Sequence, residues 1–149
     1  MNTADVLAIQ RLLADYADAV ATRDQTAWAA TWTVDCVWHL SGGRSSVGRD
    51  STVALWLSAI ERYPWVCQLV TNTIVDLDSE VTAHGRCTIL EINRLGDGSG
   101  ALHVGTYDDR YRKTDGRWQF AERKLHIMYR GPLDPGTVIP LGTTEALPR

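Results

Sequence analysis

Apolar residues near the start of the chain recur every three or four positions. The set, which continues through about residue 22, is Val6, Ile9, Leu12, Leu13, Tyr16 and Val20. This spacing is typical of an amphipathic helix with one face in the core. Asn2 or Thr3 precedes it and can cap its first turn. The pattern therefore predicts a long helix at the start of the chain.

Two further helices are predicted in the first half of the chain. Asp24 can cap a short second helix that carries Trp28 and Trp32. A turn rich in Gly and Ser leads to the third helix, which Asp50 or Ser51 can cap.

The remaining patterns are rich in β-branched and aromatic residues, as strands are. One short strand, 36–40, falls between the second and third helices. Three longer segments follow the third helix: 66–77, 81–92 and a hairpin over 101–129. Helices that come first and antiparallel strands that follow predict an α+β fold. We expect a curved sheet packed on helices rather than an alternating parallel fold.

The hairpin turns at Thr114-Asp115-Gly116, and the length of its loop decides which side chains share a face. A two-residue loop of Asp115 and Gly116 places Thr114 opposite Arg117. A three-residue loop with Gly116 in the left-handed conformation instead pairs Lys113 with Arg117.

We favour the three-residue loop because it gathers several apolar residues of the hairpin on one surface. These residues are Gly105, Tyr107, Leu125 and Ile127. His103 and Arg123 fall on the same surface. An imidazole and a guanidinium among apolar neighbours cost desolvation free energy unless they are paired or used. Both are therefore candidates for function.

Composition is that of an ordinary globular domain. The chain has 149 residues, of which 44% are hydrophobic and 22% charged, so one domain with a sizeable core is expected. The net charge of -3 and the scattered Lys and Arg residues argue against a nucleic-acid partner. The composition also gives no reason to expect a membrane partner.

The three cysteines are far apart, and each lies in an apolar run. Cys36, Cys67 and Cys87 suit reduced, mostly buried thiols better than a disulfide framework or a zinc site. The chain starts with a helical pattern and shows no signal peptide. We therefore expect a cytoplasmic protein.

Residues 1–130 are predicted to form one domain and residues 131–149 an irregular tail. The tail holds four of the five prolines. A metal site has little support, because His84, His103 and His126 lack tight ligand spacing.

Three runs of sequence resemble a known family. They are LLADYADAVATRDQTAWAATWTVDCVW, TNTIVDLDSEVTAHG and GTYDDRYRKTDGRWQFAER. They resemble the SnoaL-like branch of the nuclear transport factor 2-like superfamily over residues 5–130. That branch includes polyketide cyclases, scytalone dehydratase and hexachlorocyclohexane dehydrochlorinase. The resemblance implies a cone-shaped α+β barrel with a curved mixed sheet, three N-terminal helices and one apolar cavity.

The residues depart from the catalytic pattern of that family. The dehydratases and the dehydrochlorinase use an Asp and a His at the positions that Ala21 and Gln68 occupy here. Ala21 cannot ionise, and Gln68 cannot accept a proton near neutral pH. Tyr16 matches the oxyanion-binding Tyr of steroid Δ-isomerase, a more distant relative, whereas Leu40 stands roughly where its general base would be. Trp38, Tyr107 and Arg123 match pocket-lining positions.

The resulting hypothesis is a small-molecule enzyme that acts by proton transfer without a metal or organic cofactor. It would catalyse cyclisation, dehydration or isomerisation of a hydrophobic, oxygenated substrate such as a polyketide, terpenoid or steroid-like ring. His103 would move the proton, and Tyr16 and Gln68 would hydrogen-bond a substrate oxygen. Arg123 would supply positive charge, and Asp109 is the carboxylate base expected near the hairpin face. The side chains expected to line the site are Trp38, Leu40, Gln68, Cys87, Ile89, Tyr107, Leu125 and Ile127.

Each role has an alternative. His103 can be a core residue bound to a backbone carbonyl, and Tyr16 can serve packing alone. Arg123 can form an internal ion pair, with Asp24, Asp108 or Asp109 as its partner. The loss of the family's Asp and His also leaves open a noncatalytic ligand-binding or assembly subunit on the same fold.

The outer face of the sheet is predicted to mediate self-association. In the favoured register Trp118, Phe120 and Met128 fall on the face away from the cavity, where they would form an apolar patch. We therefore expect a homodimer or homotrimer.

Overall fold

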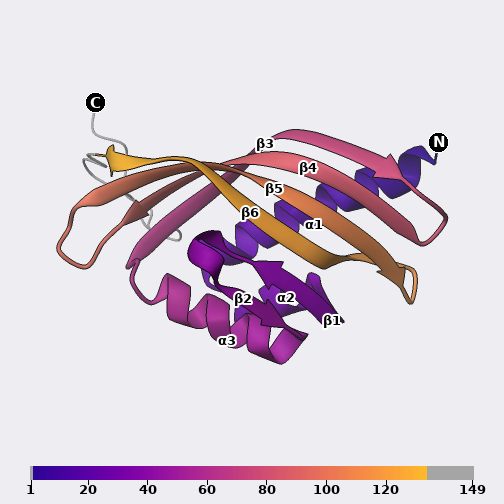
Figure 1. Ribbon diagram of the computed structural model, residues 1–149, viewed down its shortest axis with the longest axis horizontal. Helices are drawn as coiled ribbons and strands as arrows, with labels where there is room; N and C mark the ends of the chain where they lie inside the picture. Colours follow the sequence, from indigo (N-terminus) through magenta and orange to yellow (C-terminus); the bar gives the residue numbers. More distant parts are fainter. Residues whose placement is uncertain (1, 134–149) are drawn as a thin grey trace, which may run out of the picture.

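The computed structural model of the protein describes residues 2–133 (Figure 1). Its helices are α1 (Thr3–Thr22), α2 (Gln25–Ala30) and α3 (Arg49–Ile60), with a short 3₁₀ helix η1 (Ser41–Gly43). Its strands are β1 (Trp32–His39), β2 (Ser45–Val47), β3 (Trp65–Leu77), β4 (Thr82–Arg94), β5 (Gly100–Thr114) and β6 (Arg117–Leu133).

The six strands form one curved sheet in the order β2-β1-β6-β5-β4-β3. The pairing of β1 with β6 is parallel and the other four pairings are antiparallel, so the sheet is mixed. The sheet arches over the helices, with α1 packed on β3 and α3 on β1 (Figure 1). The expected α+β, cone-shaped architecture is confirmed. Within residues 2–133 the cone is open, because β2 and β3 are unpaired edges of the sheet.

The helix caps follow the sequence prediction in two of three cases. The Asn2 side chain accepts a hydrogen bond from the Ala4 N–H at 3.1 Å and begins α1. The Asp24 side chain accepts one from the Ala27 N–H at 2.9 Å and begins α2. The third cap is different, because Gly48 with φ 85° precedes α3.

The second helix is shorter than expected. It ends at Ala30, and Trp32 is the first residue of β1 rather than part of the helix. The strand β2 was not predicted, because its three residues lie in a stretch rich in Gly and Ser. Its pairing with β1, which has Trp38 opposite Ser46, stabilises it as a strand.

The hairpin between β5 and β6 has the two-residue loop, so the favoured three-residue loop was wrong. Thr114 pairs with Arg117, and Asp115 and Gly116 have φ of 50° and 75°. Two positive φ values in a two-residue loop are the mark of a type I′ turn, whose twist matches that of the strands.

The first of two bulges in β6 nevertheless restores the expected sharing of a face by odd residues. Ala121 is an extra residue between the pairs Tyr111–Phe120 and Arg110–Glu122. Beyond it odd residues of β5 face odd residues of β6, as the three-residue loop would have arranged. The pairs themselves differ by two positions, because Tyr107 pairs with Leu125 and Gly105 with Ile127. Met128 is a second extra residue, so that His103 pairs with Arg130. Each bulge moves the side chains of the strand by one position and so reverses their faces.

This change of face places Trp118 and Phe120 in the core. They are 6% and 0% exposed, so the predicted outer apolar patch does not include them. Of the three residues expected there, Met128 is exposed, at 67%. Inside, Trp28 stacks on Trp56 with their ring centroids 4.5 Å apart. The core between sheet and helices is therefore unusually aromatic.

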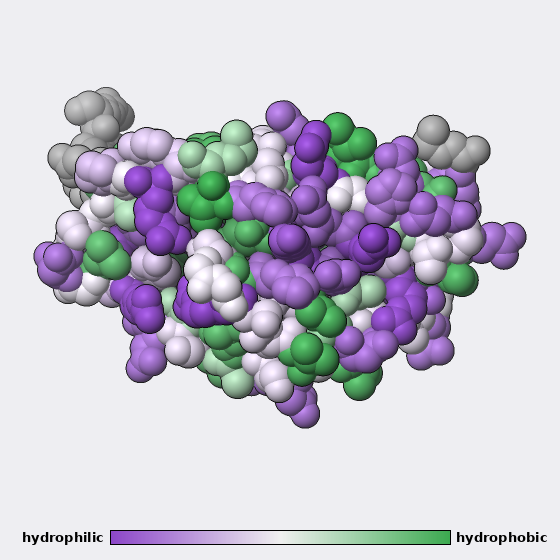
Figure 2. Space-filling view, in the orientation of Figure 1, coloured by the Kyte–Doolittle hydropathy of each residue, from purple (hydrophilic) through white to green (hydrophobic). Residues whose placement is uncertain are grey.

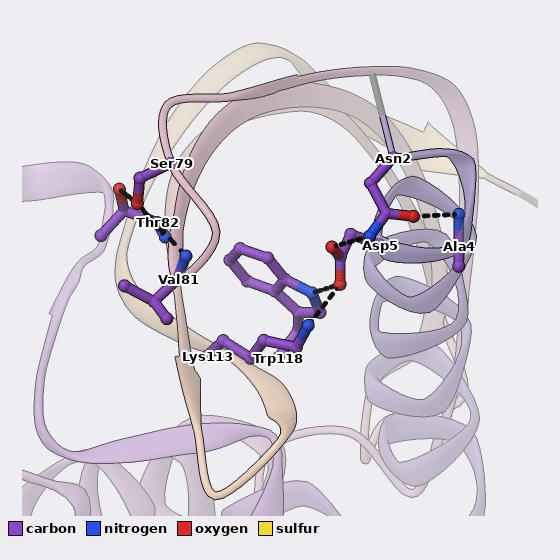
Figure 3. A network of polar contacts seen from close by, with 8 residues as sticks. All are labelled: Asn2, Ala4, Asp5, Ser79, Val81, Thr82, Lys113 and Trp118. Atoms are coloured by element: carbon purple, nitrogen blue, oxygen red, sulfur yellow. Dashed lines mark hydrogen bonds and ion pairs between the residues drawn. The ribbon is translucent and has the colours of Figure 1, made fainter.

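The start of α1 is tied to the tip of the hairpin through Asp5 (Figure 3). Its Oδ1 accepts hydrogen bonds from Lys113 Nζ at 2.7 Å and from Trp118 Nε1 at 2.8 Å. Asn2 Nδ2 donates to its Oδ2 at 2.7 Å. The first turn of the chain and its last hairpin thus form one polar junction.

Figure 2 shows apolar residues scattered among polar ones on the visible face of the molecule. No helix within residues 2–133 has the length and apolar character needed to cross a membrane. Within the same residues the three cysteines are free thiols. β6 continues to Leu133, beyond the predicted domain end at residue 130, and the rest of the predicted tail, 134–149, lies outside the described residues.

Candidate active site

A cavity of about 100 Å³ lies between the concave face of the sheet, α1 and α3. Most of its wall is apolar or aromatic, and each strand from β3 to β6 contributes to it. The predicted residues that line it are Tyr16, Trp38, Leu40, Gln68, Ile89, His103, Tyr107, Leu125 and Ile127. Most residues that the sequence placed at the cavity therefore line it, although the three-residue turn used to place them does not form.

Three predicted site residues do not line this cavity. Asp109, Arg123 and Cys87 are buried deeper in the core, at 3%, 1% and 1% exposure. Arg123 donates hydrogen bonds to Asp109 from Nε at 2.7 Å and from Nη2 at 3.1 Å. Of the alternatives for Arg123, the ion pair with Asp109 is therefore the one that forms.

The burial of this ion pair corrects the direct roles expected for both residues. Tyr111 also donates to Asp109, at 2.9 Å, so that carboxylate has three donors and is not a free base. Burial raises the pKa of Asp109, against the effect of these hydrogen bonds. Burial alone would lower the pKa of Arg123, but the nearby Asp109 raises it overall, so the guanidinium stays charged. Arg123 can supply charge only from behind the cavity wall.

Arg123 reaches the cavity indirectly, through aromatic rings. Its guanidinium carbon lies 3.8 Å from the centroid of the Tyr107 ring and 4.5 Å from that of Tyr16. Burial raises the pKa of both phenols, that of Tyr107 well above its usual value. Both hydroxyl groups therefore stay protonated and can donate to a substrate oxygen.

Cys87 also lies behind the wall. Arg123 Nη2 is 3.5 Å from its sulfur, and burial raises the pKa of the thiol. A neutral buried thiol is a packing group rather than a nucleophile.

A row of four polar residues crosses the apolar wall from β3 to β6, four strands that lie side by side in Figure 1. Gln68 pairs with Glu91, Glu91 with His103 and His103 with Arg130. All four side chains line the cavity. Residues directly opposite each other on paired strands have Cβ atoms about 5 Å apart, so neighbours in the row can interact.

Glu91 is the centre of this row. Gln68 Nε2 donates to its Oε2 at 3.0 Å, and Asn93 Nδ2 donates to its Oε1 at 3.2 Å. His103 Nδ1 lies 3.4 Å from the same Oε1. The His103 side chain is 11% exposed and that of Glu91 19%, so both are largely withdrawn from solvent. The site therefore contains a carboxylate next to an imidazole.

Sequence reasoning missed Glu91, although a signal was present. Cys87 and Ile89 had been placed on the inner face of β4, and alternation along a strand puts residue 91 on the same face. An acidic residue within the apolar run CTILEIN was thus a candidate by the argument applied to His103.

Two buried polar atoms of lining residues have no hydrogen-bond partner among the described residues. They are Gln68 Oε1, an acceptor, and Trp38 Nε1, a donor. Gln68 is 8% exposed and Trp38 3% exposed. Buried groups of this kind are usually satisfied in proteins, so they are available to a bound molecule.

The other three histidines lie on the outer face of the sheet. Each contacts an acidic residue there: His39 with Glu122 at 3.0 Å, His84 with Asp78 at 2.8 Å and His126 with Asp108 at 2.9 Å. Among residues 2–133, no group of three or more His, Cys, Asp or Glu side chains is arranged to hold a metal ion.

The family model of the SnoaL-like domain matches residues 1–124, most of the chain. The chain belongs to the SnoaL-like family. No curated protein sequence is significantly similar to it.

Several solved structures share the SnoaL-like fold seen here. A Novosphingobium aromaticivorans protein, whose assignment as a scytalone dehydratase is itself provisional, is 24% identical, with a TM-score of 0.83 over 97% of each chain. Hexachlorocyclohexane dehydrochlorinase LinA-type3 from Novosphingobium barchaimii is 24% identical, with a TM-score of 0.83 over 93% of this chain and 96% of its own. A Mycobacterium tuberculosis protein of unknown function is 26% identical, with a TM-score of 0.76 over 96% of this chain and 87% of its own.

Ala21, at one position of the expected SnoaL-like acid-base pair, does not line the cavity. It borders an open groove between α1 and β3, where it lies with Gln68. Gln68 lines both the groove and the cavity. Of these two positions, only Gln68 thus contributes a polar group to the cavity.

Proposed function

We propose that this protein is a small-molecule enzyme that transfers protons with His103 and Glu91, without a metal or organic cofactor. The observation that carries the proposal is the position of the His103 imidazole, which lines the cavity 3.4 Å from the Glu91 carboxylate. The reaction class is dehydration, isomerisation or cyclisation.

The roles of the two groups follow from their contacts. Glu91 is held by Gln68 and Asn93, so it can fix the orientation of the imidazole and stabilise its protonated form. With Nδ1 directed at Glu91, Nε2 of His103 is the nitrogen that takes a proton from a substrate carbon. A positioned imidazole near a carboxylate is a common proton carrier at neutral pH.

The two tyrosines complete the chemistry. Tyr16 and Tyr107 donate hydrogen bonds to a carbonyl oxygen, which gains negative charge when the neighbouring C–H bond breaks. In an isomerisation, protonated His103 returns the proton to another carbon. In a dehydration the C–O bond breaks, a C=C bond forms, and the proton leaves with the hydroxide as water. Arg123 supports both tyrosines through contacts with their rings.

Fold relatives agree with this class at a coarse level. Scytalone dehydratase and the dehydrochlorinase are lyases, so the fold can house proton removal coupled to loss of a leaving group. Fold alone does not fix the reaction. The proposal therefore depends on the side chains of this cavity.

The volume of the cavity favours a compact substrate. About 100 Å³ is below the range of roughly 300–1,000 Å³ for sites that hold drug-sized ligands. It is also below the roughly 150 Å³ of an apolar cavity that binds benzene. A six-membered ring would already need a small movement of side chains of the wall, and a multi-ring polyketide or steroid a much larger one, so we favour molecules of one ring or smaller.

Exchange of substrate hydrogen with solvent tests the proposal across a panel of compounds. Small ketones and hydroxyketones would be incubated with the protein in D₂O, and loss of C–H signals followed by NMR. We expect exchange with at least one compound, and a fall of roughly 10²-fold to 10⁴-fold in His103→Gln. The loss in the double variant with Glu91→Gln should be less than the product of the two single losses, because the two residues act as a unit.

His126→Gln is the matched control, because it removes an imidazole beside a carboxylate on the outer face. It should exchange at the wild-type rate. Full activity in folded His103→Gln would refute the assignment. Absence of exchange with every compound would instead favour the noncatalytic ligand-binding alternative, which the replacement of the family's Asp and His by Ala21 and Gln68 supports.

A further inference from the structure

Two arginines at the edge of the cavity have no role in the proton transfer described above. Arg130 is the last member of the polar row, on β6, and Arg44 follows η1. Both line the cavity and both are exposed to solvent. They therefore mark its open end, whereas His103 and Gln68 are buried.

Neither guanidinium has an acidic partner within residues 2–133. Six other arginines form an ion pair or a side-chain hydrogen bond: Arg11, Arg23, Arg49, Arg110, Arg112 and Arg123. Arg44 and Arg130 make none with the described residues. Two guanidinium groups that line one cavity of this size, with no acidic partner among residues 2–133, attract a negatively charged group.

The charges of the cavity wall set the charge of that group. Among the lining residues in the described part of the chain, Glu91 is the one acidic side chain, and Arg44 and Arg130 contribute two positive charges. With His103 neutral, the site carries one excess positive charge. A monoanion neutralises it, whereas a dianion such as a phosphate monoester would leave an excess negative charge beside Glu91.

The geometry also decides where the anion lies. Arg130 and His103 are directly opposite each other on β6 and β5, so a group bound to Arg130 lies beside the imidazole. At the solvent-exposed end the anion stays partly hydrated and costs little desolvation. The apolar body of the molecule then faces inward, toward Ile89, Leu125 and Trp38.

We propose that the substrate is a small carboxylic acid, bound as its anion, whose carboxylate is held by Arg130 and Arg44 at the open end of the cavity. The reacting C–H bond lies within a few bonds of this carboxylate, next to His103. This inference names a substrate class for the function proposed above and rests on it for the reaction, but anion binding can be tested without turnover.

Calorimetric titration with paired probes tests the inference. Crotonate and benzoate would be compared with their uncharged amides, crotonamide and benzamide, at low ionic strength. We expect each acid to bind about tenfold more tightly than its amide, in line with the strength of hydrogen bonds to charged groups. The preference should weaken as salt is added, because exposed charges are screened. Methyl phosphate should bind more weakly than crotonate.

Single substitutions test which arginine causes the preference for the acid over the amide. Arg130→Gln should abolish most of the difference between acid and amide, and Arg44→Gln part of it. Arg86→Gln is the matched control, because Arg86 is an exposed arginine of β4 that does not line the cavity. It should keep the full preference.

Three outcomes would overturn the inference: equal binding of acid and amide, an unchanged preference in Arg130→Gln, or no binding of either acid at millimolar concentration. His103→Gln separates this inference from the proposed function. It should lose proton exchange yet keep the preference for the acid. Wild-type protein that binds acids but exchanges no proton would refute the enzyme assignment and retain the anion site.

Discussion

The ion pair of Asp109 and Arg123 gives the sharpest prediction about stability. Both side chains are buried, at 0% and 1% exposure, and the guanidinium lies against the rings of Tyr16, Tyr107 and Phe120. Replacement of Asp109 by Asn keeps the size of the side chain but removes its charge. The charged Arg123 would then be buried without a counterion.

The expected loss of stability is large. Breaking a buried ion pair by changing one partner costs about 3–5 kcal/mol in the free energy of unfolding. Asp109 also accepts a hydrogen bond from Tyr111, so a value in the upper part of that range is expected. For a domain of this size such a loss lowers the melting temperature by roughly 10 °C. Urea unfolding followed by Trp fluorescence measures the free energy directly.

Asp108→Asn is the matched control, because it changes the preceding residue, whose exposed carboxylate contacts His126. Its effect should stay within about 0.5 kcal/mol. The double variant Asp109→Leu with Arg123→Met should be more stable than Asp109→Asn, because it removes both charges and leaves neither one isolated. A loss below about 1 kcal/mol in Asp109→Asn would refute the reasoning that Arg123 depends on this carboxylate.

Two further predictions concern the polar junction and the sheet edge. Hydrogen bonds from Lys113 and Trp118 lower the pKa of Asp5 below 3.8, so ionised Asp5 stabilises the fold above that pH and its contribution is lost as the pH falls through the lowered value. Asp5→Asn should therefore unfold at a lower urea concentration than wild type near neutral pH, and the difference should shrink as the pH falls below 3.8. A difference that does not shrink in acid would contradict this. In the part of the chain that the structure describes, β3 is a long unpaired edge that exposes Leu69 and Ile74, so we still expect a dimer or trimer. Sedimentation of the full chain as a monomer at micromolar concentration would speak against it.

The sequence alone determined most of the elements and the fold class. The spacing of apolar residues in α1, the caps at Asn2 and Asp24, and the long strands all depend on local chemistry that acts over a few residues. The inward position of His103 could also be found, because an imidazole between apolar neighbours is visible in the chain. These features do not depend on contacts between distant parts of the chain.

The tertiary structure decided which residues meet in the site. Each bulge in β6 adds one residue, reverses the faces of the strand and so decides that Trp118 and Phe120 lie inside and that Arg130 stands beside His103. The row from Gln68 to Arg130 requires the registers of three strand pairs at once, and a one-residue error in any of them would disperse it. The pairing of Arg123 with Asp109 depends on the same registers. Local patterns fix each strand, but pairing between strands is set by turns, bulges and packing across the whole sheet, which is why the site emerged only from the fold.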